Sequence, residues 1–114
     1  MLHIGKCILG KKPRIVAVVS SMLSPRRMPG LKKQGADILE IRADLLNTDF
    51  EKILHFTRTI RRKSGLPCIA TIRETKGNKA QRYQMFKRII PLVDAIDIEI
   101  DAAVGRDVIK LAKH

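Results

Sequence analysis

The sequence has few of the residues that commonly stabilise or equip a small protein. Tryptophan is absent and aromatic residues make up 4% of the 114 residues, so the core must be built from aliphatic side chains. Cysteine occurs twice, as Cys7 and Cys68, and neither belongs to a CxxC pair. This spacing excludes the common zinc motifs and a disulfide-rich fold, and we expect no metal site. Both thiols are predicted to be reduced and buried.

Long apolar runs are also missing. No stretch approaches the ~20 apolar residues that a membrane-spanning helix needs. Gly and Lys interrupt the N-terminal MLHIGKCILGKKP too often for a signal peptide. We therefore expect a cytoplasmic protein without a membrane partner.

Acidic residues are scarce relative to basic ones. The chain has 11 Asp and Glu against 23 Lys and Arg, a formal net charge of +12. Such an excess indicates a nucleic acid, an acidic membrane or an anionic substrate as partner. The basic residues are scattered in short groups without interleaved aromatics, which disfavours nucleic acid. A basic module that binds RNA or DNA, or another non-catalytic α/β module, stays open as the alternative to an enzyme.

Apolar, β-branched runs alternate with helical patterns along the chain. Strands are predicted at 13–19, 36–42, 66–74 and 94–101, and helical segments at 20–35, 47–65, 78–93 and 104–114. This order predicts an α/β fold with a parallel sheet covered by helices. We expect a single domain over residues 1–114, with a hairpin at 1–12 and four β/α units at 13–114. In the helix at 47–65, Thr48 and Glu51 predict a capping box and Gly65 predicts the end.

Several of the predicted strands carry charged residues on one face. Glu40 and Arg42 stand two residues apart and therefore share a face, while Arg73 ends the next strand. In the last strand Asp97 and Glu99 share a face opposite a row of isoleucines, Ile96, Ile98 and Ile100. A sheet with one apolar face and charges near the strand ends is typical of a closed barrel, whose interior holds the active site. Because a (β/α)8 barrel takes about 250 residues, four units predict half of one.

Four segments resemble a known family. GADILEIRADLL (35–46) resembles the ExRxD segment of type I 3-dehydroquinate dehydratase, and GLPCIATIRE (65–74) resembles its third strand. VDAIDIEID (93–101) is similar to its fourth strand, and IGKCILGKKPRIVAV (4–18) to its N-terminal hairpin and first strand. The resemblance covers nearly all of this chain. It covers only the first half of the family's barrel, so we expect a truncated TIM barrel.

The resemblance implies a lyase of the shikimate pathway of aromatic amino acid biosynthesis. Family members convert 3-dehydroquinate to 3-dehydroshikimate through a Schiff base between a lysine and the substrate ketone, with a histidine as proton shuttle and no cofactor. Glu40, Arg42 and Arg73 would contact this small anionic polyol, and Asp44 and Glu99 would support them. Guanidinium groups suit the task because they stay charged when desolvated.

The sequence also departs from the family. The catalytic histidine and lysine lie on later strands, and His3, His55 and His114 do not match that histidine. We therefore expect no catalytic residue and no turnover by this chain alone, whether it is a fragment of a longer protein or a natural short one. Half a barrel exposes sheet edges, which predicts self-association.

Two alternatives remain for the charges themselves. Glu40 and Arg42 could form a buried ion pair that bridges strands, without touching a ligand. Asp97 and Glu99 could complete a charged interior layer by pairing with Arg42 and Arg73.

Overall fold

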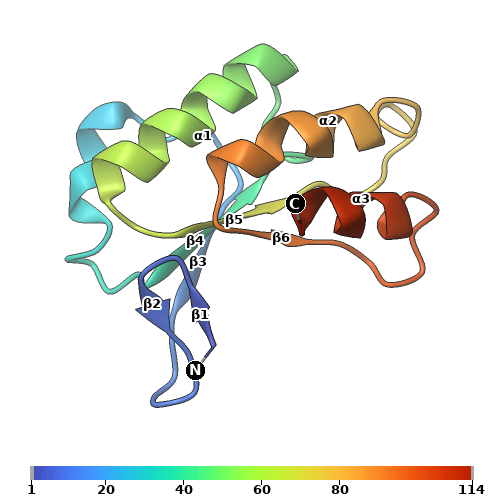
Figure 1. The fold of residues 1–114 in the computed structure, drawn as a ribbon. Coiled ribbons are helices and arrows are strands. Elements are labelled where there is room, and N and C mark those ends of the chain that lie inside the picture. Colours follow the sequence, from blue (N-terminus) through green and yellow to red (C-terminus); the bar gives the residue numbers. More distant parts are fainter. Residues whose placement is uncertain (1, 114) are drawn as a thin grey trace.

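Four parallel strands form the centre of the fold (Figure 1). The computed structural model describes residues 2–113. The strands are β3 (Val16–Val19), β4 (Ile38–Arg42), β5 (Cys68–Thr71) and β6 (Ala95–Asp97), and they are hydrogen-bonded in that order. Because the spatial order equals the chain order, each crossover leads to the adjacent strand, as in a barrel.

The helices lie on one side of the sheet, with the N-terminal hairpin on the other (Figure 1). They are η1 (Pro25–Gly30), α1 (Phe50–Ser64), α2 (Arg82–Ile89), η2 (Ile90–Leu92) and α3 (Gly105–Ala112). The hairpin consists of β1 (His3–Ile4) and β2 (Cys7–Ile8), which pair antiparallel. The helical segment after β3 is a short 3-10 helix, as expected from its two prolines.

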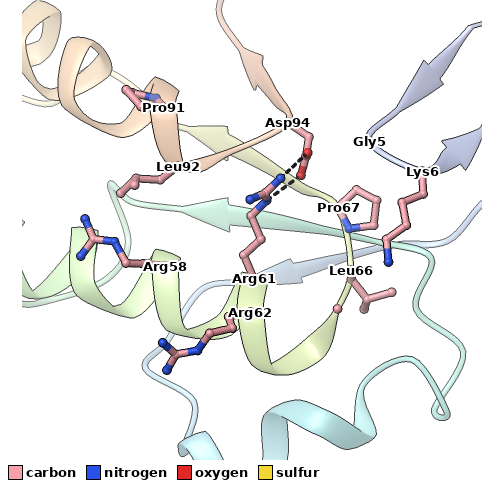
Figure 2. Close-up of a pocket in the computed structure, with 11 residues that line it drawn as sticks. Gly5, Lys6, Arg58, Arg61, Arg62, Leu66, Pro67, Pro91, Leu92 and Asp94 are labelled. Carbon is pink, nitrogen blue, oxygen red and sulfur yellow. Dashed lines mark hydrogen bonds and ion pairs between the residues drawn. The ribbon is translucent and has the colours of Figure 1, made fainter.

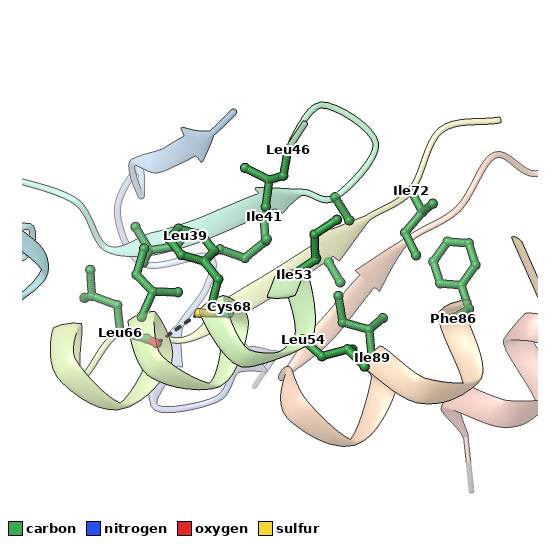
Figure 3. Close-up of a cluster of buried hydrophobic side chains, with 14 of the residues drawn as sticks. Leu39, Ile41, Leu46, Ile53, Leu54, Leu66, Cys68, Ile72, Phe86 and Ile89 are labelled. Atoms are coloured by element: carbon green, nitrogen blue, oxygen red, sulfur yellow. Dashed lines mark hydrogen bonds between the residues drawn. The ribbon is translucent and has the colours of Figure 1, made fainter. Parts of the chain in front are cut away.

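The hydrophobic core lies between the sheet and α1 and α2 (Figure 3). Alternate residues of the strands point toward the helices, and a stripe on each helix meets them. The most buried members each have no exposed surface; they are Leu39, Ile41, Ile60, Cys68, Ala70, Ile72, Phe86, Ile89 and Val108. The fully enclosed core is thus mainly aliphatic, with two phenylalanines, Met28 and Cys68 among its members, as the composition requires.

The opposite face of the sheet has no helix over it. Val16 and Val18 lie on this face at 43% and 55% exposure, although valine in a parallel sheet is normally buried. A parallel sheet covered on one face only is half of the TIM barrel architecture, because the barrel interior would enclose the second face. The α/β half-barrel predicted from the sequence is confirmed.

The start of α1 differs from the prediction. The N-cap is Asp49, whose carboxylate accepts a hydrogen bond of 2.9 Å from the Lys52 backbone N–H. The capping box of Thr48 and Glu51 is therefore wrong, because an aspartate one residue later fills the same role. The predicted end is confirmed: Gly65 follows the helix at a φ of 68°, a left-handed conformation that favours glycine.

The last strand is shorter than predicted. β6 ends at Asp97, and Ile100 is 98% exposed instead of joining an apolar face. Beyond Asp97 the chain turns, with the Ala102 N–H bonded to the Glu99 carbonyl at 3.1 Å.

Two further expectations concern cysteine and membranes. Cys68 is buried but Cys7 is only half-buried, so the prediction for Cys7 is wrong. Cys7 belongs to the two-residue strand β2, which is too short to be covered on all sides.

Within residues 2–113, no helix has the length and apolar character needed to cross a membrane. His114 lies outside the described residues.

Candidate functional site

Polar and charged side chains from three strands gather on the uncovered face of the sheet. The strand register places Arg42 beside Thr71 and Thr71 beside Asp97, so these three residues form one row. Glu40 lies one pleat earlier, beside Ile69. The row stands at the C-terminal ends of the strands, where (β/α)8 enzymes carry their active sites.

Glu40 is held by a neighbouring strand. Its Oε2 accepts a hydrogen bond of 2.6 Å from the hydroxyl of Thr71, which is fully buried. Among residues 2–113, no ion pair joins Glu40 to Arg42. The alternative of a strand-bridging ion pair between these two is therefore wrong.

Arg42 pairs instead with Asp44. Its Nε and Nη2 donate to the two carboxylate oxygens at 3.1 and 2.8 Å, a bidentate geometry. Hydrogen bonding to Asp44 raises the pKa of Arg42. Burial alone would raise the pKa of Asp44. The hydrogen bonds from Arg42 and from the backbone of Arg73 and of Asp44 itself, together with the charge of Arg42, outweigh burial, and the pKa lies below its ordinary value. Asp44 thus stays charged and fixes the plane of the guanidinium.

Arg73 bridges two carboxylates at the end of β5. Its Nη2 lies 3.1 Å from Asp97 Oδ2 and its Nη1 lies 3.2 Å from Glu99 Oε1. The expected charged layer exists in part, but both carboxylates pair with Arg73 and neither with Arg42. The reason is that Arg42 already has a carboxylate two residues along its own chain, in Asp44.

Arg82 was missed by the sequence reasoning. It lies in α2 at 1% exposure, with Nε 2.7 Å from the Ile72 carbonyl and Nη2 2.6 Å from Glu99 Oε1. Burial would raise the pKa of Glu99, but its own backbone amide and Arg82 lower it overall. A signal was present, because Arg82 is a basic residue four and seven positions before Phe86 and Ile89 on an apolar helical stripe.

The uncovered face is hollowed beside these charges. A hollow of about 480 Å³ is lined by Glu40 and Asp97 and by apolar residues from the hairpin, β3, β5, β6 and the segment after β6, namely Ile4, Val16, Ile69, Ala95, Ile96 and Ile98. Neither lysine nor histidine lines it among the residues that the structure describes. Within the same residues no group of three His, Cys, Asp or Glu side chains could hold a metal ion. Glu40 and Asp97 supply acceptor carboxylates in this hollow. The guanidinium of Arg73 contacts Asp97, and Arg42 shares a strand face with Glu40, so donor groups stand beside the hollow. Acceptors and donors side by side suit a hydroxylated anion.

A second hollow, of about 490 Å³, lies at the other end of the strands (Figure 2). Arg61 of α1 donates two hydrogen bonds, of 3.0 and 2.8 Å, to Asp94, which also accepts from the Cys68 backbone N–H. The turn residue Gly5 has a φ of 55°, and a Cβ there would lie 3.0 Å from Pro67. These contacts fasten the hairpin and α1 to the sheet, so this end has a structural role.

Comparisons with known proteins agree with this architecture. A family model described as Type I 3-dehydroquinase matches residues 16–114. The chain is 37% identical to the 3-dehydroquinate dehydratase of Methanosarcina barkeri, over 99% of this chain and 51% of that protein. It is 36% identical to the 3-dehydroquinate dehydratase of Methanococcoides burtonii, over 100% of this chain and 52% of that protein.

A solved structure shares the fold. The 3-dehydroquinate dehydratase from Aquifex aeolicus VF5 superposes with a TM-score of 0.71 at 24% identity, covering 87% of this chain and 48% of that chain. The present chain spans about half the length of the curated relatives it matches.

Proposed function

The chain belongs to the type I 3-dehydroquinase family, and we propose that it forms the substrate-binding half of such an enzyme. The observation that supports this is the gathering of Glu40, Arg42 and Arg73 on the uncovered face of the sheet, where Glu40 lines a hollow and Arg73 contacts Asp97, which lines it too. The proposed ligand is 3-dehydroquinate, a small anionic polyol.

Each of the three side chains has a distinct proposed task. Arg42 and Arg73 would donate hydrogen bonds to the carboxylate and oxygen atoms of the substrate, and both are partly exposed, at 26% and 40% of their side chains. Glu40 would accept from a substrate hydroxyl through the carboxylate oxygen that Thr71 does not use. Asp44 and Glu99 would orient the two arginines.

The chemical step needs groups that this chain does not offer at the site. In the proposed reaction a lysine forms an imine with the substrate ketone, which acidifies the adjacent C–H, and a histidine transfers the proton while hydroxide leaves as water. The family's lysine and histidine have no counterpart at the hollow in residues 2–113. We therefore propose that the 114-residue chain binds substrate in the cytoplasm but does not dehydrate it alone.

Binding and chemistry can be tested separately. Calorimetry with 3-dehydroquinate should give a one-site isotherm for the wild type that is lost in Arg42→Met. The matched control is Arg58→Met, the same change at an arginine beside the structural hollow. Borohydride added with substrate should leave the mass unchanged; a mass gain on one lysine would show that the chain performs the covalent step.

The same calorimetry distinguishes the basic-module alternative. Binding that rests on phosphate contacts weakens steeply as salt increases, whereas a pocket that recognises 3-dehydroquinate responds mainly to that anion. Tight, strongly salt-dependent binding of an oligonucleotide without any response to 3-dehydroquinate would favour the alternative.

We also propose that a second copy of the chain covers the open face. Val16 and Val18 are exposed there, and the edge strands β3 and β6 have free hydrogen-bonding groups on one side. Two half-barrels could then close one eight-stranded ring. Sedimentation should show a dimer that Val18→Lys dissociates, while Leu2→Lys, a change at a residue 79% exposed, leaves it intact. A wild-type monomer at all concentrations would contradict this.

A further inference from the structure

Arg82 belongs to a closed ring of contacts that includes Arg73. Its Nε donates to the carbonyl of Ile72, the residue directly before Arg73, at 2.7 Å. Its Nη2 donates at 2.6 Å to Glu99 Oε1, and the same oxygen lies 3.2 Å from Arg73 Nη1. Arg82 therefore holds both the backbone next to Arg73 and the carboxylate that meets the Arg73 guanidinium.

The burial of Arg82 is difficult to explain by stability alone. Its side chain is 1% exposed, and Nη1 has no hydrogen-bond partner among residues 2–113. The ring of Phe86 lies 5.5 Å from the guanidinium carbon and compensates in part through a cation–π contact. An apolar side chain of similar volume at this position would avoid the desolvation of a charge and pack on the same stripe. The arginine is thus better suited to fixing a geometry than to filling the core.

Arg73 needs such support. Its side chain is 40% exposed, and a long flexible arginine loses much rotamer freedom when it binds a ligand. A site that holds its arginine in the binding conformation beforehand avoids part of that loss. Asp97 restrains one side of the guanidinium, and Glu99 restrains the other only while Glu99 is itself fixed.

We infer that Arg82 is a positioning residue that fixes Arg73 for ligand binding through Ile72 and Glu99. The task of Arg73 rests on the proposed function above, but the positioning itself does not. Arg82 touches no ligand in this arrangement, because it has almost no exposed surface.

Four variants of the full chain test the inference. Arg82→Met removes the charge at nearly constant volume. Arg82→Lys restores a donor that reaches one of the two partners of Arg82, the Ile72 carbonyl or the Glu99 carboxylate. Glu99→Gln weakens the contact that joins Arg82 to Arg73. Because the Glu99 side chain is 31% exposed, this variant tests the inference if Arg82→Met does not fold. Arg88→Met is the control, since Arg88 lies in the same helix at 48% exposure and does not contact Arg73.

The first measurement needs no ligand. The NMR order parameter of the Arg73 Nε–H should fall from a rigid value near 0.85 to below about 0.6 in Arg82→Met and Glu99→Gln. It should recover in part in Arg82→Lys and stay unchanged in Arg88→Met. An Arg73 that stays rigid in both Arg82→Met and Glu99→Gln would overturn the inference, even if stability falls.

The second measurement is the affinity for 3-dehydroquinate. Arg82→Met should weaken it about tenfold, with partial rescue by Arg82→Lys and no change in Arg88→Met. If the wild type does not bind but Arg73 still loosens in Arg82→Met, the positioning stands and the proposed function fails. If the wild type binds and Arg82→Met binds equally well, the inference is wrong and the proposed function stands.

Discussion

The hydroxyl of Thr71 donates a hydrogen bond of 2.6 Å to Glu40 Oε2 and joins β5 to β4 on the uncovered face of the sheet. Thr71 is completely buried, so water cannot replace this bond without opening the sheet. The second carboxylate oxygen of Glu40 has no protein partner among residues 2–113. The pair therefore fixes the carboxylate and leaves one oxygen for a ligand.

Thr71→Val should lower both stability and ligand affinity. The change keeps the shape of the side chain but removes the donor to Glu40, so we expect a loss of about 1–2 kcal/mol in the free energy of unfolding. Urea unfolding measures the stability, and calorimetry with 3-dehydroquinate measures the affinity. The control is Thr57→Val in α1, another fully buried threonine, whose hydroxyl donates to the Ile53 carbonyl. If both variants reduce affinity equally, Thr71 acts through stability alone.

Asp44→Asn should disturb Arg42. Asparagine offers one acceptor oxygen in place of the carboxylate that meets two guanidinium nitrogens, and the Asp44 side chain is only 4% exposed. We expect a loss of about 2 kcal/mol in the free energy of unfolding and weaker binding of 3-dehydroquinate. Unfolding in guanidinium chloride at pH 7 measures the free energy of unfolding. Unchanged affinity would mean that Arg42 does not need Asp44 to meet the ligand.

The pair of Arg61 and Asp94 should make stability sensitive to acid. The bond from Arg61 holds the pKa of Asp94 below its ordinary value of 3.8. A lowered pKa means that the stabilisation is fully present above about pH 4 and is lost as the pH falls through the folded-state pKa. Asp94→Asn should therefore be less stable than the wild type at pH 7, and this difference should shrink below pH 4. Thermal unfolding from pH 7 to pH 2 measures it; a constant difference would contradict the assignment.

The N-cap of α1 can be tested with two neighbouring residues. Asp49→Ala should cost about 1 kcal/mol in the free energy of unfolding, because it removes the acceptor for the Lys52 N–H. Thr48→Ala should cost much less, since Thr48 lies outside the helix. The reverse order in chemical unfolding would restore the capping box that the sequence predicted.

The two thiols should react very differently. Burial raises the pKa of Cys68 to about 12, while Cys7 is half-buried in the hairpin. Because the thiolate is the reactive form, one thiol per folded chain should react rapidly with a disulfide reagent at pH 8. The second should react only in denaturant. Cys7→Ser should abolish the fast reaction, and a fast reaction that survives this change would place Cys68 closer to solvent than the structure does.

The strands and helices could be predicted because their patterns are local. Alternation in ILEIR and the apolar stripe of Ile53, Leu54 and Ile60 each follow from one short segment. The family resemblance likewise rests on short strand segments, and it was confirmed by the match over residues 16–114. The predictions were wrong at the ends of elements, at Thr48 before α1 and at Ile100 after β6. Single hydrogen bonds and turns determine where a helix or strand begins and ends.

The partners of the charged residues could not be predicted. Sequence spacing placed Glu40 and Arg42 on one face, and that follows from strand geometry alone. Whether Glu40 bonds to Arg42 or to Thr71 depends on the register between β4 and β5, which no single segment contains. Arg82 shows the same limit, because its partners Ile72 and Glu99 come from two other segments of the chain.

The sequence by itself determined a β/α alternation, a one-sided charged sheet and the family, because these properties reside in residue order and side-chain direction. The tertiary structure alone decided that Thr71 holds Glu40, that Glu99 connects Arg73 to Arg82, and that one face of the sheet stays open. These relationships depend on distances between segments far apart in the chain, and those distances are set only when the sheet and helices pack together.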